Sequence, residues 1–284
     1  MSAISPPPPQ TSSAELPPLP LTVEGASVLH QMFRVRWPAW KAHDEGERGV
    51  ILREAASLFE EMESKQSAIF SLLGHKGDLL LVHYRNSVDE LNQAELQIAR
   101  TKLFDYLEQT TSYLSVVELG LYKSTIALYR SLAERAVEPF SKQWNSEIEE
   151  TMQRQREAMR PRLYPSIPPL KYLCFYPMDR RRGEHKNWYR LAITERGRQM
   201  EDHGNIGQRY AGAVKQIISG SIGFDDWEWG VDLYADDPIV FKKLIYEMRF
   251  DEVSAVYSDF GTFYMGIRCP AGELGQLLSL DSPS

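Results

Sequence analysis

The first half of the chain alternates short apolar runs with amphipathic stretches, in an order typical of a small α+β unit. Apolar residues recur near a spacing of 3.6 between 47 and 64, which predicts a helix. Runs rich in β-branched and aromatic residues predict strands, and Ser87 with Glu90 three residues later predicts the start of a second helix. The predicted elements are a strand (29–37), a helix (47–64), two strands (66–74 and 78–85), a helix (87–109) and a strand (112–122).

The second half repeats this β-α-β-β-α-β order after a connection. Residues 125–160 predict helix with a break at Pro139, and the prolines of 160–170 predict a linker that cannot be helical. Pro238 suits the first turn of a helix, where its missing N–H costs nothing. The predicted elements are a strand (171–178), a helix (192–211), two strands (214–221 and 227–235), a helix (238–249) and a strand (253–268) with a bend at Gly261.

Two such units in succession predict an α+β fold of two ferredoxin-like β-α-β-β-α-β repeats, the dimeric α/β-barrel type. Each sheet carries helices on one face, so its other face must be buried, and the sheets are expected to pack together or close into a barrel. A ligand cavity is then expected between a sheet and its own helices. The Pro-rich residues 1–20 predict a disordered tail, followed by an N-terminal domain with a helical extension (21–160) and a C-terminal domain (161–284).

The composition is that of a soluble globular protein, with 43% hydrophobic and 25% charged residues. No apolar run approaches the roughly 20 residues that cross a bilayer, so an integral membrane protein is not expected. The N-terminus lacks the features of a secretory signal. The two cysteines show no CxxC spacing and fit a reducing, cytoplasmic location.

The net charge of −7 argues against nucleic-acid binding. A local basic cluster is more informative, because it suggests a small anionic ligand rather than a polyanion. It consists of Arg160, Arg162, Arg180, Arg181, Arg182 and Lys186.

Among the six histidines, His203 has unusual neighbours. The segment RQMEDHGNIGQRYAG (198–212) places Gly204 and Gly207 near it on one helix face, which would let a large flat ligand approach the backbone. The alternative, that these glycines only loosen or end the helix, is equally well supported by this stretch alone. The chain contains no HExxH, CxxCH, GxSxG or GxxxxGK(S/T) motif, so an ordinary hydrolase, ATPase or c-type cytochrome is poorly supported.

From about residue 160 onward, the chain resembles the chlorite dismutase-like superfamily, and within it the coproheme decarboxylase branch. The stretches that carry the resemblance are CFYPMDRRR (174–182), NWYRL (187–191), DHGNIGQRYAGAVKQIISGSIGFDDWEWGV (202–231) and DPIVFKKLIYEMRFDEVSA (237–255). The N-terminal half fits the same two-lobed architecture with fewer diagnostic residues. The resemblance implies a porphyrin-binding C-terminal domain and a homopentamer.

The resemblance also assigns roles to individual residues. His203 matches the axial ligand of the haem iron, whose donor strength depends on what its other ring nitrogen bonds. Tyr176 matches the tyrosine that forms a radical and abstracts hydrogen from a propionate. The residues matched to porphyrin carboxylates or to the surrounding pocket are Arg162, Arg180, Arg249, Ser254 and Trp227. Arginine suits such carboxylates because charge-assisted hydrogen bonds both hold and orient them; many relatives have lysine where Arg180 stands.

Gln216 separates the branches of the superfamily. Chlorite dismutases place an arginine at this distal position, and a neutral amide would stabilise leaving hypochlorite poorly. Gln208 stands where relatives often carry arginine near the ligand entrance, which is a departure that concerns substrate gating.

The activity implied by the resemblance is peroxide-dependent oxidative decarboxylation of iron coproporphyrin III (coproheme). Two propionates become vinyl groups by way of a three-propionate intermediate, giving haem b, so the substrate is also the redox centre. Hydrogen peroxide is the co-substrate, and a ferrochelatase is the expected donor of coproheme. The alternatives are a chlorite-degrading or peroxidase-like haem enzyme, which Gln216 disfavours, and a non-catalytic haem carrier, which would not need Tyr176.

Overall fold

The computed structural model describes residues 16–279. The first half comprises β1 (Thr22–Val35), α1 (Trp37–Lys41), α2 (Glu45–Ser64), β2 (Ser67–Leu72), β3 (Leu79–Arg85), α3 (Val88–Ala99), η1 (Lys102–Tyr106) and β4 (Leu107–Gly120). Two helices, α4 (Tyr122–Glu134) and α5 (Lys142–Leu163), connect it to the second half. Most of the tail predicted over 1–20 lies outside the described residues.

The second half repeats the pattern with insertions. It comprises β5 (Tyr172–Arg180), η2 (Trp188–Arg190), α6 (Ile193–Arg209), β6 (Lys215–Gly220), β7 (Trp229–Ala235), α7 (Ile239–Met248), α8 (Glu252–Tyr257), β8 (Ser258–Phe260), β9 (Tyr264–Cys269), η3 (Ala271–Glu273) and α9 (Leu274–Leu278). No helix among residues 16–279 is long and apolar enough to cross a membrane.

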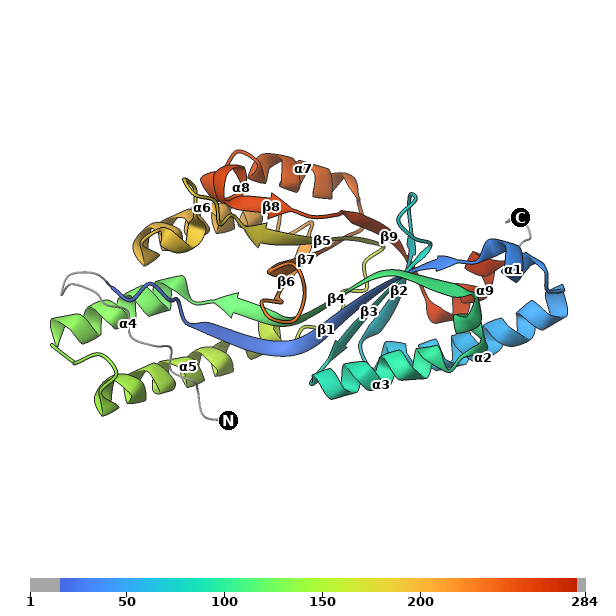
Figure 1. Cartoon of the computed structure of the whole chain (residues 1–284), viewed down its shortest axis with the longest axis horizontal. Helices are drawn as coiled ribbons and strands as arrows, with labels where there is room; N and C mark the ends of the chain where they lie inside the picture. Colours follow the sequence, from blue (N-terminus) through green and yellow to red (C-terminus); the bar gives the residue numbers. More distant parts are fainter. Residues whose placement is uncertain (1–15, 280–284) are drawn as a thin grey trace.

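The strands close into a barrel, as the buried faces of two ferredoxin-like sheets require. The first half runs in the order β4-β1-β3-β2 and the second in the order β9-β5-β7-β6, which is the same arrangement of strand positions in each half. The pairs β2–β9 and β4–β6 join the halves into a ring, and β8 adds to the edge of β5. The fold class predicted from the sequence is therefore confirmed, and the two sheets share one interior (Figure 1).

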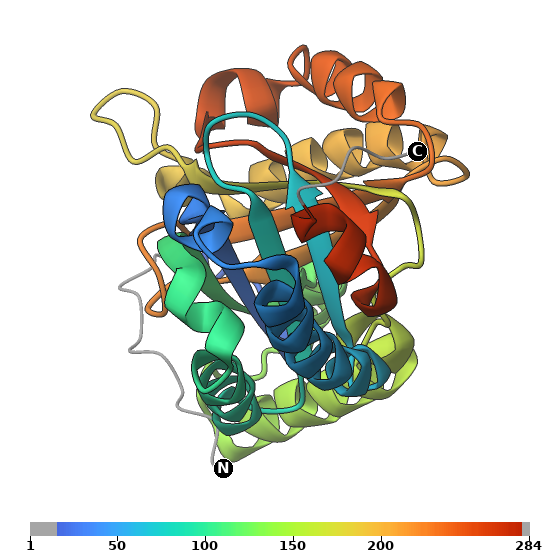
Figure 2. The same cartoon turned by 90° about the vertical axis from the view of Figure 1, so that its right-hand side faces the viewer.

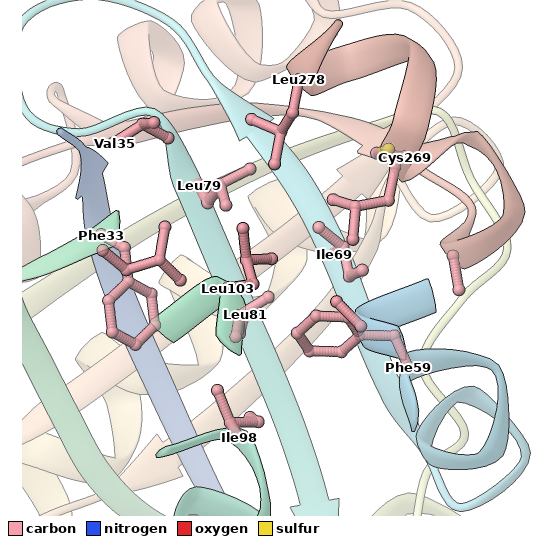
Figure 3. Close-up of a cluster of buried hydrophobic side chains, with 14 of the residues drawn as sticks. Phe33, Val35, Phe59, Ile69, Leu79, Leu81, Ile98, Leu103, Cys269 and Leu278 are labelled. Atoms are coloured by element: carbon pink, nitrogen blue, oxygen red, sulfur yellow. The ribbon is translucent and has the colours of Figure 1, made fainter. Parts of the chain in front are cut away.

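Alternate residues of each strand face the barrel interior or the helices. On the helix side of the first half, β-strand residues pack against α2, α3 and α9; Figure 3 shows Phe33, Val35, Phe59, Ile69, Leu79, Leu81, Ile98, Leu103, Cys269 and Leu278 of this cluster. On the helix side of the second half, Tyr176, Leu233 and Phe241 belong to a separate cluster under α6 and α7. Helices α2 and α3 of the first half and helices α6 and α7 of the second lie on different sides of the barrel in both views (Figures 1 and 2).

The division into domains at 160/161 stays a prediction, and two contacts bear on it. Helix α9 follows the last strand yet packs into the core of the first half, where Leu274 and Leu278 are buried with α2. Helix α5 continues through Pro161 to Leu163, three residues past the predicted end of the helical stretch at residue 160. A side chain at Gly25 would clash with the Leu163 carbonyl. Glycine at this position therefore allows the last turn of α5 to pack directly against β1. This packing outweighs the helix-breaking tendency of proline.

Three of the predicted element boundaries were wrong. The second helix ends at Ala99 rather than 109, and β4 begins at Leu107 after a short 3₁₀ turn. The strand predicted over 253–268 is instead α8, the short β8 and β9, with the break around Gly261 where a bend was predicted. Asp251 caps α8 by accepting a hydrogen bond from the Ser254 N–H, which favours helix over strand for this β-branched and aromatic stretch.

Candidate functional site

The candidate site centres on His203 in α6 and its carboxylate partner. His203 Nδ1 lies 2.8 Å from Oδ2 of Asp251, at the corner between α7 and α8. The His203 side chain is 21% exposed and that of Asp251 only 6%, so the carboxylate is shielded while the ring reaches the surface. With Nδ1 donating to a carboxylate, Nε2 carries a lone pair and faces away from that bond. This is the arrangement of an imidazole prepared to bind a metal ion.

Two hydrogen bonds hold the Asp251 carboxylate, one from a backbone N–H and one from a side chain. Oδ1 accepts from the backbone N–H of Ser254 at 2.7 Å, and Oδ2 takes the bond to His203. Burial raises the pKa of Asp251, but the hydrogen bonds from His203 and Ser254 outweigh burial and leave the pKa below its ordinary value. The carboxylate therefore stays ionised, and one residue both starts α8 and orients the His203 ring.

Arg180, at the end of β5, is a partly buried cation without a carboxylate partner. Its Nη1 donates to Ser258 Oγ at 2.5 Å and its Nη2 lies 3.4 Å from Met200 Sδ, one turn before His203. The guanidinium lies 4.9 Å from the ring centre of Trp188 and 5.9 Å from that of Trp229. Within residues 16–279 it forms no ion pair, and burial lowers its pKa. An enclosed cation of this kind is costly unless an anion pairs with it.

The neighbouring arginines behave differently from Arg180. Arg181 pairs with Asp259 at 2.7 Å and Arg182 lies 3.7 Å from Glu228, and both are well exposed. Of these three consecutive arginines, Arg181 and Arg182 therefore lie on the surface, and only Arg180 is directed into the site.

Tyr176 lies on the helix-facing side of β5 in a largely aromatic environment. Its ring stacks on Phe263 at 4.5 Å between centres and lies 6.0 Å from Phe260. The guanidinium of Arg249, at the end of α7, lies 3.6 Å above the Phe260 ring. Burial raises the pKa of Tyr176 well above its ordinary value, while the charges of Arg249 and Arg180 act in the opposite direction. Tyr176 is thus a neutral phenol on which the charges of two arginines act.

The structure brings most of the predicted residues together but separates two of them. His203, Arg180, Arg249, Ser254 and Tyr176 come from α6, β5 and the α7–α8 corner, which adjoin one another. Gln216 on β6 reaches the same side, because a side chain at Gly207 would meet its Oε1 at 3.8 Å. A side chain at Gly204 would meet nothing within 4 Å, so the open approach that its sequence position suggested is present.

Arg162 and Trp227 lie apart from this group. Arg162 is exposed on α5 and contacts Met159 of its own helix, and α5 and α6 lie on different sides of the barrel (Figures 1 and 2). Trp227 packs at Gly261 and lines a cavity at the barrel mouth with Phe175. These two assignments stay predictions from the resemblance.

Sequence reasoning missed three residues of the site. Asp251 escaped notice because the stretch after it was predicted as a strand, although DEVS (251–254) is itself an N-cap pattern. Trp229 and Ser258, which contact Arg180, gave no local signal because their role depends on the pairing of β5 with β7 and β8.

Two cavities of about 500 and 400 Å³ lie elsewhere, at the start of β2 and at the barrel mouth. Among residues 16–279, no three His, Cys, Asp or Glu side chains gather in a way that could hold a bare metal ion. With Nδ1 bonded to Asp251 and open space at Gly204, His203 offers one nitrogen ligand, Nε2, which is what the iron of a porphyrin takes from a proximal histidine.

The fold and the site together define a class of protein: a barrel of two ferredoxin-like repeats in which a carboxylate orients a histidine of helix α6 in the second repeat. The family model described as chlorite dismutase matches residues 48–269. The chain belongs to the chlorite dismutase family.

Similar proteins extend this result. A protein of Haloquadratum walsbyi named as heme-binding is 43% identical over 271 residues, covering 93% of this chain and 47% of that protein. The chain thus spans about half the length of this curated relative. A solved structure from Thermus thermophilus, described as a heme-binding protein, has 37% identity and a TM-score of 0.77, covering 93% of this chain and 99% of that one. A variant chlorite dismutase from Candidatus Nitrospira defluvii has a TM-score of 0.68 over 90% of this chain and 96% of its own, at 17% identity, which shows the fold alone.

Proposed function

We propose that this protein is a coproheme decarboxylase, which converts two propionates of iron coproporphyrin III to vinyl groups with hydrogen peroxide and yields haem b. The observation that carries the proposal is that Tyr176 and Arg180 lie four residues apart on β5, on the face that the helices of the second half cover, and that the charge of Arg180 acts on the phenol. A neutral phenol thus shares one face of β5 with an enclosed guanidinium that forms no ion pair within residues 16–279, in the same group as a carboxylate-oriented histidine. A propionate supplies the missing anion and brings its own β-carbon to the phenol.

Iron binding falls to His203 in this proposal. Its Nε2 is the free nitrogen, and the bond from Nδ1 to Asp251 increases the electron donation of the ring. The open space beside Gly204 accommodates the approach of a flat ring to α6. The names of the relatives from Haloquadratum walsbyi and Thermus thermophilus, which describe heme binding, support this part of the proposal independently of the catalytic residues.

The carboxylates of coproheme are held by the cations around Tyr176. Arg180 and Arg249 form no ion pair within the described chain, so each can take a propionate through charge-assisted hydrogen bonds. Ser254 is buried at the start of α8 and offers a hydroxyl beside Asp251. Arg162 and Trp227 are proposed as further porphyrin contacts on the resemblance alone.

The bound iron supplies the oxidising equivalents that hydrogen peroxide provides. Tyr176 then gives up one electron and the proton of its hydroxyl, and the resulting phenoxyl takes a hydrogen atom from the β-carbon of the propionate that Arg180 holds. Loss of a second electron releases carbon dioxide and leaves a vinyl group. Each round consumes one propionic acid and one peroxide and yields one vinyl group, one carbon dioxide and two waters. Burial keeps Tyr176 protonated until it is oxidised.

A non-catalytic haem carrier is the second candidate, because the names of both similar proteins mention only heme binding. A carrier would need His203 and Asp251 but would gain nothing from the arrangement around Tyr176. Chlorite decomposition is disfavoured because Gln216, a neutral amide, stands where that chemistry uses an arginine.

The experiment is to add hydrogen peroxide to the coproheme-loaded protein and separate the porphyrins by chromatography. The proposal predicts a three-propionate intermediate followed by haem b. If the protein binds coproheme but the coproheme is recovered unchanged, the non-catalytic haem carrier is favoured. Oxygen evolution on adding chlorite would favour chlorite decomposition. The homopentamer, the cytoplasmic location and a ferrochelatase as coproheme donor are proposals from the resemblance; the first is tested by light scattering of the purified chain.

A further inference from the structure

The barrel interior contains a buried polar cluster that the proposed reaction does not use. Nε2 of His30, on β1, lies 2.9 Å from Oδ1 of Asp232, on β7. The hydroxyl of Tyr84, on β3, donates to Oδ2 of the same carboxylate at 2.8 Å. All three residues are at least 97% buried. The hydroxyl of Tyr234 lies 3.4 Å from that of Tyr84.

The surroundings of this cluster are apolar, which makes its presence informative. Val28, Phe70, Val82 and Leu173 are among the neighbours that fill the same interior. Placing a carboxylate and an imidazole there costs desolvation energy, and apolar residues of similar volume would be at least as stable. Nδ1 of His30 also has no hydrogen-bond partner among the described residues. A function therefore accounts for the cluster better than stability does.

The cluster lies directly across the sheet from Tyr176. In the pairing of β5 with β7, Tyr176 is opposite Val231 and Phe175 is opposite Asp232. Neighbouring strands lie about 4.8 Å apart, so Asp232 is one strand spacing from Phe175, the residue before Tyr176, and the side chains of Asp232 and Tyr176 lie on opposite faces of the sheet. The ring of Phe175 stacks on His30 at 4.0 Å between centres, so the residue before Tyr176 contacts the cluster directly.

The chemistry of the cluster is that of an easily oxidised phenol. A tyrosine gives up an electron more readily when an acceptor already holds its hydroxyl proton in a hydrogen bond, because the proton then leaves with the electron. Asp232 is that acceptor for Tyr84, and His30 holds the other oxygen of the same carboxylate.

We propose that Tyr84 is a second redox-active tyrosine, which donates an electron to the porphyrin site when an oxidising equivalent finds no propionate to react with. This inference rests on the proposed function. In the step, the O–H bond of Tyr84 breaks, its proton moves to Oδ2 of Asp232, and its electron cancels one of the two oxidising equivalents that one hydrogen peroxide brings to the porphyrin site, while the second equivalent stays at that site. A neutral phenoxyl remains on Tyr84. The device diverts oxidation from the porphyrin and from Tyr176 once the substrate is consumed.

The test uses the full chain loaded with haem b, in which the two reactive propionates are already vinyl groups. The protein is mixed with hydrogen peroxide, freeze-quenched and measured by electron paramagnetic resonance. All proteins compared carry Tyr176→Phe, because Tyr176 is itself proposed to form a phenoxyl and would add its own signal. In this background we expect a tyrosyl radical that is lost in Tyr84→Phe and strongly reduced in Asp232→Asn, which keeps Tyr84 but removes its carboxylate proton acceptor. The matched control is Tyr129→Phe, since Tyr129 is also buried but donates to the Leu19 carbonyl in a different core; this variant should keep the signal.

The outcomes separate the inference from the proposed function. A radical signal that persists in a folded Tyr84→Phe protein, as judged by circular dichroism, would overturn the inference and leave the proposed decarboxylation standing. If Tyr84→Phe does not fold, Asp232→Asn decides in the same way. If the wild-type chain shows no haem absorption band, the proposed function fails and the inference fails with it.

Discussion

His203 and Asp251 are 48 residues apart in the chain, yet the carboxylate of Asp251 lies 2.8 Å from Nδ1 of His203. The same aspartate begins α8 by accepting the Ser254 N–H. The carboxylate is buried and accepts hydrogen bonds from both His203 and the Ser254 N–H. The turn between α7 and α8 therefore determines the orientation of the histidine ring.

Asp251→Asn should change the ligand strength of His203 more than the stability of the fold. Asparagine is as good an N-cap as aspartate, but its neutral amide polarises the imidazole less. The ferric/ferrous potential of the haem-loaded protein should therefore rise, as measured by spectroelectrochemical titration. Asp259→Asn, at an exposed aspartate paired with Arg181, is the control and should leave the potential unchanged. An equal potential in wild type and Asp251→Asn would contradict the role of this pair.

Arg180→Met should weaken coproheme binding without lowering the stability of the porphyrin-free protein. Removing a charge-assisted pair costs about 1.5–3 kcal/mol, roughly a ten- to hundredfold loss of affinity. The porphyrin-free protein loses an enclosed cation that has no ion pair, so its thermal unfolding midpoint should not fall. Arg181→Met is the matched control, because that neighbour is exposed and paired with Asp259. Equal coproheme affinity of the two variants, by absorption titration, would argue against Arg180 as a propionate anchor.

Substitutions of Trp227 and Trp229 should differ in their effect on coproheme affinity. Trp229 packs in the helix-side cluster and lies 5.9 Å from the Arg180 guanidinium, whereas Trp227 lines the barrel mouth. Trp229→Phe should weaken coproheme binding more than Trp227→Phe does, because Trp229 lies beside the Arg180 guanidinium. The opposite order, measured by the same titration, would support the placement of Trp227 that the resemblance implies.

Stability should fall in mild acid because of His83. Burial, aided by the charges of Arg85 and His30, lowers the pKa of His83 from 6.5 to about 3. Between these values the unfolded chain binds a proton that the folded chain does not, so stability is lost as the pH falls below 6.5. This group alone contributes up to about 1.4 kcal/mol per pH unit. His83→Gln should flatten the dependence of the unfolding midpoint between pH 6.5 and 4; an unchanged slope would show that His83 is not the group responsible.

The fold was predictable because the apolar periodicity of each repeat is local. The order β-α-β-β-α-β could be read directly from runs such as 66–74 and 78–85, and the requirement to bury both sheet faces pointed to the barrel. The failures were also local. The stretch VSAVY (253–257) has strand-like residues, but the Asp251 cap and the buried positions of Val253 and Tyr257 make it helical. Pro161 predicted a helix end that the packing of Leu163 against β1 overrides.

The site was predictable only as a set of residue types. The segment around His203 suggested a flat ligand, and the basic cluster suggested an anion, but neither identified the partner of His203. That partner depends on the corner between α7 and α8, which sequence periodicity did not locate. The distinction between Arg180 and its two exposed neighbours likewise depends on which side of β5 each faces.

The central claim is that Tyr176 oxidises propionates held beside it. The most direct measurement is a titration of the coproheme-loaded chain with hydrogen peroxide, followed by mass spectrometry of the porphyrin, in wild type and in Tyr176→Phe. The account predicts two successive losses of a carboxyl group in wild type and none in Tyr176→Phe, with coproheme binding retained in both. Equal loss of carboxyl groups in the two proteins, or intact coproheme in both, would contradict it.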